Sequence, residues 1–209
     1  MTLSGSYHRH GKRSLSYRDL IKALIYLPLG RETVSWLRLI SYQLSMIIGI
    51  DNGACSGAAV AISSWDGAVI GYTRLPSHKV GKKTELDMIR FRDWVLDFKL
   101  PPVNIVIEEP LHHAPSSQSM RSMAMCYGQL IGLCTGMAWP WEGLPVREWQ
   151  RDMLGKFPKG MSKKYALAKA KELAPEEQWF ATARSQKPHD GIVDAYLMAV
   201  REYEQNYKN

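Results

Sequence analysis

Two short apolar runs, each followed by an acidic residue, constrain the fold of this chain more than any other feature. MIIGI (residues 46–50) precedes Asp51, and VNIVI (residues 103–107) precedes Glu108. Runs of this length and composition predict strands that are buried in a sheet. An acid at a strand tip has no packing role, and an uncompensated charge there is costly. We therefore expect a site at this edge of the sheet, although Asp-Asn-Gly also suits a plain turn and paired acids also end surface strands.

The order of the other segments predicts an α/β fold with a mixed, five-stranded sheet flanked by helices. Three antiparallel strands come first, and two strands that follow helices are added to them. The segment HKVGKK is predicted to be a basic loop, and the helix after it is expected to turn Leu86, Ile89, Trp94, Val95 and Phe98 inward. The predicted strands are residues 46–50, 58–63, 69–75, 103–107 and 144–146, and the predicted helices are residues 85–99, 118–138, a helix from 147, 161–173 and 190–203.

Residues 1–44 are predicted to form a basic helical extension that is separate from a domain at residues 45–209. The extension carries a net charge of +5, out of +7 for the whole chain. Apolar residues recur at helical spacing in residues 16–27 and 31–43, and Pro28-Leu29-Gly30 separates the two stretches. This pattern is compatible with a helix-turn-helix or with a plain helical hairpin.

Composition narrows the class of protein. No apolar run approaches the roughly 20 residues of a membrane span, so no membrane association is expected. The three cysteines, Cys55, Cys126 and Cys134, show no metal-ligand spacing and suit reduced thiols in the cytoplasm. An organelle transit peptide stays open as an alternative, because the N-terminus is acid-poor and contains Arg and Ser. The pI of about 9.3 suits a polyanionic partner.

Two further acids, Asp190 and Asp194, lie at the start of the last helical pattern, HDGIVDAYLMA. They are four residues apart and share a helix face, where like charges repel. Each has a local alternative: Asp190 as a helix N-cap and Asp194 as a partner of the helix dipole. If the fold gathers these two with Asp51 and Glu108, cations or protons must relieve their repulsion. Hard carboxylate oxygens favour Mg²⁺ or Mn²⁺, and hence metal-assisted phosphodiester chemistry.

Histidines and lysines near these acids supply further candidates. His189 is a candidate metal ligand or proton carrier, or else a solvated residue beside a helix cap. His112 and His113 are adjacent and would diverge in an extended chain, so they are not interpreted as a metal pair. Lys163 or Lys164 would stabilise charge on a reacting phosphate. Phosphate neutralisation or a merely solvated surface is expected for Lys79, Lys82, Lys83, Lys163, Lys164, Lys169 and Lys171.

The helix predicted at residues 118–138 carries small residues at four-residue spacing, namely Ala124, Gly128 and Gly132. Because glycine in a helix costs about 1 kcal/mol relative to alanine, such a stripe favours close approach of another backbone. That backbone is expected to be the sheet or a partner subunit. Side chains at the start of this helix could wedge between bases of deformed DNA, or pack in a core or dimer; they are Met120, Arg121, Met123 and Met125.

Six segments in this order also appear in a known family: IIGIDNGACSGAAVAI, NIVIEEP, MCYGQLIGL, VREWQRDMLG, SKKYALAKAKELAP and HDGIVDAYLMA. Over about residues 46–205 the chain resembles the RuvC-like Holliday junction resolvases of the ribonuclease-H-like superfamily. It is most similar to the phage-type enzymes and the chloroplast resolvase. Residues 1–44 have no counterpart in the resolvase core.

The resemblance implies a ribonuclease-H-like fold and a metal-dependent endonuclease that resolves four-way DNA junctions. By position, Asp51 matches the first-strand acid, Glu108 the fourth-strand acid and Asp194 the last-helix acid. Either Asp190 or His189 matches the remaining ligand position. The family further implies two Mg²⁺ or Mn²⁺ ions per site and no small-molecule cofactor. It also implies a homodimer that makes paired nicks, leaving 5′-phosphate and 3′-hydroxyl ends.

Three other functions remain as alternatives at this point. The chain could be a DNA-binding adaptor without catalysis, or a flap or branched-DNA nuclease without strict junction symmetry. GIDNG also opens the fold of actin-like and sugar-kinase-like ATPases. Those enzymes need a duplicated domain and a second phosphate loop, for which this chain is too short.

Overall fold

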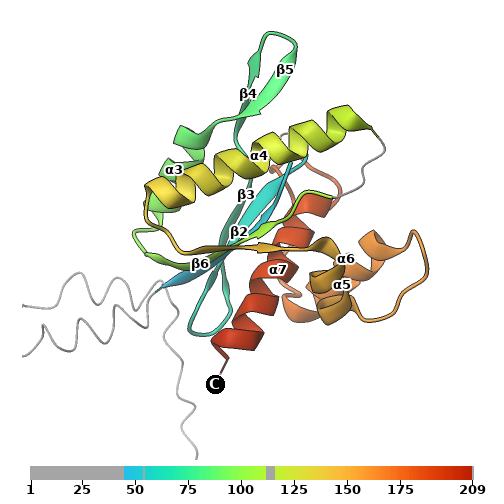
Figure 1. Ribbon diagram of the computed structural model, residues 1–209. Helices are drawn as coiled ribbons and strands as arrows, with labels where there is room; N and C mark the ends of the chain where they lie inside the picture. The colour runs from blue at the N-terminus through green and yellow to red at the C-terminus, as the bar shows by residue number, and fades with distance from the viewer. Residues whose placement is uncertain (1–44, 54, 112–115, 209) are drawn as a thin grey trace, which may run out of the picture. The chain divides into compact units, whose positions relative to one another are not determined.

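The computed structural model describes residues 45–53, 55–111 and 116–208, and these form a central five-stranded sheet with helices on both faces (Figure 1). The strand order is β3-β2-β1-β6-β7. β1 pairs antiparallel with β2, and β2 with β3, whereas β1–β6 and β6–β7 are parallel. The predicted mixed sheet is confirmed. Its strands are β1 (Met46–Asp51), β2 (Ala58–Ser63), β3 (Val69–Arg74), β6 (Pro102–Glu108) and β7 (Trp141–Leu144).

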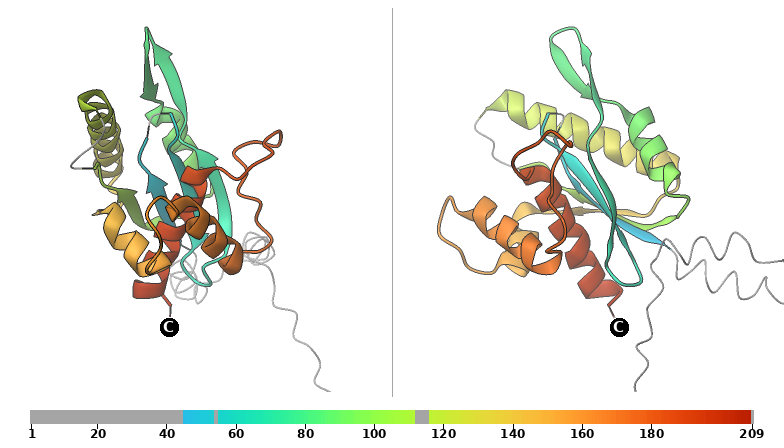
Figure 2. Two further views of the ribbon diagram at one scale, coloured as in Figure 1. Left: turned by 90° about the vertical axis from the view of Figure 1, so that its right-hand side faces the viewer. Right: turned by 180° about the vertical axis from the view of Figure 1, so that it is seen from behind.

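Alternating residues of the central strands feed two separate cores. Ile47 and Val106 pack on the face covered by the C-terminal helices, and Ile48 and Ile50 pack on the opposite face. Figures 1 and 2 show the two helical layers with the sheet between them. One layer holds α3 (Met88–Asp97) and α4 (Ser117–Gly136), and the other holds α5 (Val146–Leu154), α6 (Ser162–Leu173) and α7 (Asp190–Asn206).

Helix α7 lies unusually close to β1 because β1 has a glycine at the point of contact. A Cβ atom at Gly49 would lie 2.0 Å from the carbonyl oxygen of Ala195, which no side chain tolerates. Most of α7 is buried as a result, including Ile192 and Leu197. The missing side chain therefore brings the start of α7, with its two acids, toward the end of β1.

Helix α3 begins later than predicted, and its inward face differs. Asp87 is the N-cap and accepts a hydrogen bond from the backbone N–H of Arg90 at 3.1 Å. Leu86 belongs to the preceding strand, and Phe91 is buried together with Val95. Ile89 was expected to face inward but is 64% exposed. The capping aspartate fixes the helix start, and the start fixes which residues face the core.

Two other predictions about strands were wrong. The last strand of the sheet spans 141–144, not 144–146, because Pro145 caps helix α5 and cannot donate to the ladder. The HKVGKK segment is not a loop but part of an antiparallel hairpin, β4 (Ser77–Val80) and β5 (Lys83–Leu86). Gly81, with φ of 60°, makes its turn. The hairpin escaped prediction because its strands lack alternating apolar residues.

The predicted helical extension at residues 1–44 lies outside the described residues, as do His112 and His113. Among the helices that the structure does describe, none combines the length and the apolar character that crossing a bilayer would need.

Candidate functional site

Parallel pairing of β1 and β6 places Asp51 and Glu108 side by side. Ile50 and Ile107 are partners in the ladder, and each acid is the next and last residue of its strand. Strand alternation turns both acids to the face that α7 covers, opposite to Ile50 and Ile107. The two carboxyl groups share a side-chain hydrogen bond, and Glu108 is only 8% exposed. Glu109, by contrast, lies beside Tyr127 and Gly143.

The start of α7 brings Asp190 and Asp194 to the same place. Between them, Gly191 allows the closest approach, because a Cβ atom there would lie 2.3 Å from Asp51 Oδ2 and 2.5 Å from the Ser56 carbonyl oxygen. The N-cap of α7 is His189, and no side-chain hydrogen bond caps this helix. Asp190 is thus not the cap. We call Asp51, Glu108, Asp190 and Asp194 the carboxylate cluster.

Burial and mutual repulsion raise the pKa values of three of these carboxyl groups. Burial, then the Glu108 charge and hydrogen bond, raises the pKa of Asp51 to about 8. Burial also raises the pKa of Glu108 to about 7, and the Asp194 charge adds to it. The pKa of Asp194 rises to about 7 through burial and then the charges of Asp51 and Asp190. At neutral pH the cluster therefore lacks the positive charge that would keep it fully ionised.

One lysine contributes positive charge to the cluster. Lys163, in the first turn of α6, donates a hydrogen bond to Asp190 Oδ2, and this contact raises the pKa of the lysine. The Lys163 charge also opposes the raised pKa values of Asp51 and Asp194. Lys164 is exposed, and in the described parts of the chain it makes no ion pair with these acids. The structure thus brings Lys163, and not Lys164, to the cluster.

Glu108 has a neutral partner that sequence reasoning did not identify. Trp149 of α5, 1% exposed, donates its indole N–H to Glu108 Oε1 at 3.0 Å. This bond lowers the pKa of Glu108 against the effect of burial. It also fixes one carboxylate oxygen in place, which leaves the other for a ligand. The only available signal was a tryptophan in the first turn of the helix that follows the fifth strand of the sheet.

His189 lies beside the cluster and is half-buried. Its Nδ1 is buried, and no hydrogen-bond partner for it occurs among the described residues. Burial, followed by the nearby charge of Arg74, lowers the pKa of this imidazole. A neutral ring nitrogen suits either a metal ligand or a proton acceptor. Arg74, also not predicted, donates from Nη2 to the Cys55 carbonyl oxygen at 2.7 Å and so holds the loop that follows Asp51.

The donor set of the cluster matches a hard divalent cation in its chemistry. The donors are carboxylate oxygens, largely desolvated and short of positive charge. Within the described segments, however, no group of three or more His, Cys, Asp or Glu side chains has the geometry of a ready-made metal site. Asp51 and Glu108 are hydrogen-bonded to each other, and Asp190 is paired with Lys163. Binding an ion would therefore require these two contacts to open.

Comparison with known proteins gives matches in structure alone. No protein-family model matches the chain, and no curated protein matches its sequence. Thermus thermophilus RuvC in complex with a Holliday junction substrate is similar in structure, with a TM-score of 0.50 and 11% identity over 75% of this chain and 90% of RuvC. The chain has the ribonuclease-H-like fold of RuvC. The yeast mitochondrial Holliday junction resolvase Ydc2 matches at a TM-score of 0.45 and 20% identity, over 89% of this chain and 90% of Ydc2.

Proposed function

We propose that this chain is a metal-dependent endodeoxyribonuclease that resolves four-way DNA junctions by paired phosphodiester hydrolysis. One observation carries the proposal: Asp51, Glu108 and Asp194, far apart in sequence, converge at one edge of the sheet with raised pKa values. Structural networks also perturb pKa values, but here several acids face one another with one ion-paired lysine. The RuvC fold supports the same conclusion, because that structure contains a Holliday junction.

The carboxylate cluster would hold two Mg²⁺ or Mn²⁺ ions, with His189 as a further candidate ligand. When bound, such ions would supply an ionised water and charge neutralisation at the phosphate. The protein's part is to hold the carboxylates together. Gly49 and Gly191 let α7 approach β1, and Trp149 orients Glu108.

Lys163 has a second task in this proposal. Its ammonium group pairs with Asp190 and lies within electrostatic range of Asp51 and Asp194. The side chain is 73% exposed, so it can turn from Asp190 toward a bound phosphate. There it would stabilise the negative charge that develops during hydrolysis.

Paired cleavage requires two sites, and α4 supports a homodimer. Cβ atoms placed at Gly128, Gly132 and Gly136 would each meet nothing within 4 Å, so the sheet does not account for the small-residue stripe. Exposed Met120 and Met125 lie on the same helix. A second copy of α4 packed here would use the glycines for close backbone approach. Two-fold symmetry would then direct the two clusters at opposing strands of a symmetric junction.

A substrate panel tests this function. End-labelled four-way, three-way and flap DNA are incubated with the protein in Mg²⁺ and in EDTA. We expect paired, symmetric cuts in the four-way junction that require Mg²⁺. Binding without any cleavage would instead support a DNA-binding adaptor. Equal and unpaired cutting of flaps and three-way DNA would support a nuclease without junction symmetry.

A further inference from the structure

The β4–β5 hairpin extends beyond the sheet, and its exposed residues 77–83 contribute nothing to either hydrophobic core. Figures 1 and 2 show it projecting away from the sheet, and in Figure 1 it rises above the middle of α4. Residues 77–83 are all exposed, whereas Leu86 at its base is buried. An isolated two-stranded hairpin without an apolar face is at best marginally stable. Its exposed strands therefore call for a ligand or a partner as an explanation.

A cavity of about 330 Å³ lies between this hairpin, the first half of α4 and the loop that follows Asp51. We call it the hairpin groove. The hairpin contributes Lys82 and Lys83, and the loop contributes Cys55. Helix α4 contributes Gln118, Arg121 and Ser122.

The charge of the hairpin groove fits a polyanion. Three cations line it, Lys82, Lys83 and Arg121, against one acid, Glu85. Across the described ranges, none of these four side chains takes part in an ion pair. Neutral donors such as Gln118 and Ser122 accompany the cations, as they do at sites that contact phosphate and sugar oxygens.

The hairpin groove is connected to the carboxylate cluster through short, well-fixed segments. Asn52 directly follows Asp51, is 3% exposed and donates from Nδ2 to the Met123 carbonyl oxygen of α4 at 3.1 Å. Arg74 holds Cys55 from the other side through its carbonyl oxygen. One end of the groove thus lies on the same loop as Asp51, and the other lies on the hairpin.

We infer that the hairpin groove binds the sugar-phosphate backbone of a DNA strand and leads it to the carboxylate cluster. This inference rests on the proposed function and adds to it a contact that grips the substrate outside the cluster. A strand in the groove would meet the cations of the hairpin and of α4 together. Base identity plays no part in such a contact, so the grip is independent of sequence.

The first test measures binding without cleavage. Affinity for a labelled four-way junction is followed in EDTA over a series of salt concentrations. Each phosphate contact contributes roughly 0.9 to the slope of log K against log salt. K82A/K83A should lower that slope by roughly 2 and weaken binding about 10-fold, and R121A should lower it by roughly 1. The charge-matched control K99N/K208A, at two exposed lysines outside the groove, should stay within about twofold of the parent protein.

The second test uses Cys55, which is exposed whereas Cys126 and Cys134 are buried. Junctions carrying a disulfide-activated tether at single backbone positions should form a cross-link near the cleavage point, and Cys55→Ser should abolish it. The inference is overturned if K82A/K83A and R121A behave like the control. It is equally overturned if an acidic peptide, but not unmodified DNA, blocks the cross-link. If the protein binds the junction as described but never cleaves it, the proposed nuclease function is wrong and the inference that the hairpin groove binds DNA is still supported.

Discussion

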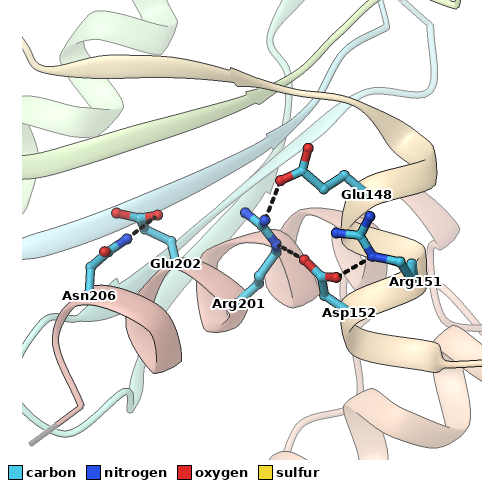
Figure 3. Close-up of polar contacts among 6 residues, drawn as sticks. All are labelled: Glu148, Arg151, Asp152, Arg201, Glu202 and Asn206. Carbon is cyan, nitrogen blue, oxygen red and sulfur yellow. Dashed lines mark hydrogen bonds and ion pairs between the residues drawn. The ribbon is translucent and has the colours of Figure 1, made fainter.

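Two groups of acids lie along α7, and they differ in how their charge is met. In the arginine network, Arg201 pairs with Glu148 and, at 2.7 Å, with Asp152, which also accepts from Arg151 (Figure 3). The next residue along α7, Glu202, accepts hydrogen bonds from two amides, those of Asn104 and Asn206.

At the other end of the same helix, no arginine in the described segments forms an ion pair with the carboxylate cluster. Trp149 supplies one neutral donor to Glu108, and Lys163 supplies one ammonium group to Asp190. Burial, and after it the charges of neighbouring acids, raises the pKa values of Asp51 and Asp194. Glu148, Asp152 and Glu202 therefore each have a cationic or amide donor, whereas Asp51 and Asp194 have no ion pair among the described residues. The predictions below test that distinction.

The largest expected effect is a difference in cleavage activity between two variants, one with an aspartate of the carboxylate cluster replaced and one with an aspartate of the arginine network replaced. Asp51→Asn keeps the size of the side chain but cannot ionise to bind a cation, so junction cleavage in Mg²⁺ should fall on the order of 10³-fold while binding survives. Asp152→Asn should destabilise the fold and leave cleavage per folded molecule unchanged. Gel-based cleavage and binding assays measure both. Full cleavage by the Asp51→Asn protein would remove Asp51 from the site.

Arg201→Met tests the arginine network from its centre. The Arg201 side chain is 10% exposed, whereas Glu148 and Asp152 are 40% and 21% exposed. Losing one partner of a fully buried ion pair costs 3–5 kcal/mol of folding stability. Because solvent reaches Glu148 and Asp152, we expect Arg201→Met to lower the free energy of unfolding by only about 2 kcal/mol. Urea unfolding measures the loss. A variant as stable as the parent protein would show that this network does not hold α5 to α7.

Trp149→Phe should have a smaller effect, which is expected both on folding stability and on the Mg²⁺ concentration that cleavage requires. Loss of the indole N–H removes one hydrogen bond to Glu108, worth about 1 kcal/mol. With Glu108 less well oriented, the Mg²⁺ concentration for half-maximal cleavage should rise about 10-fold, with junction affinity unchanged. Trp65→Phe, at a side chain that is 62% exposed, is the matched control. Equal Mg²⁺ dependence in both variants would mean that Trp149 only packs in the core and does not orient Glu108 for metal binding.

A dependence of stability on pH in the presence of a chelator tests the carboxylate cluster as a whole. Folded-state pKa values of about 7 to 8 for Asp51, Glu108 and Asp194 exceed their ordinary values of 3.8 to 4.5. Between about pH 4 and pH 8 the folded protein then binds more protons than the unfolded chain, so this contribution to stability is fully present below about pH 4, declines as pH rises and is lost once pH has passed 7 to 8. Each extra proton contributes about 1.4 kcal/mol per pH unit within this window.

Asp194→Asn isolates the cluster's share of that pH dependence. Glu142, beside Glu202, also has a pKa raised to about 7, chiefly by burial, and it contributes a slope of the same sign. Urea unfolding between pH 4 and 8 should therefore show a shallower decline for Asp194→Asn than for the parent protein. Parallel curves for the two proteins would mean that Asp194 is not held in a desolvated cluster.

The sequence was sufficient to predict the sheet and the acids at its edge, because parallel strands bring their carboxyl ends together. It could not separate Lys163 from Lys164, since neighbouring helical residues differ only in the direction they face. The Trp149–Glu108 bond joins residues 41 positions apart and exists only through tertiary packing. Gly191 gave no signal either, because its role depends on the distance to Asp51 in space.

The most direct test of the carboxylate cluster is anomalous diffraction from crystals of the protein grown with Mn²⁺ and a four-way junction. The parent protein is crystallised with a junction whose linkages at the crossover are phosphorothioates, so that cleavage is slow, and the Asp51→Asn protein serves as the control. We expect anomalous peaks among the side chains of Asp51, Glu108 and Asp194, beside a phosphate of the junction, and weaker peaks in the control. An ordered junction with Mn²⁺ peaks elsewhere, and none among these side chains, would contradict the metal-dependent nuclease.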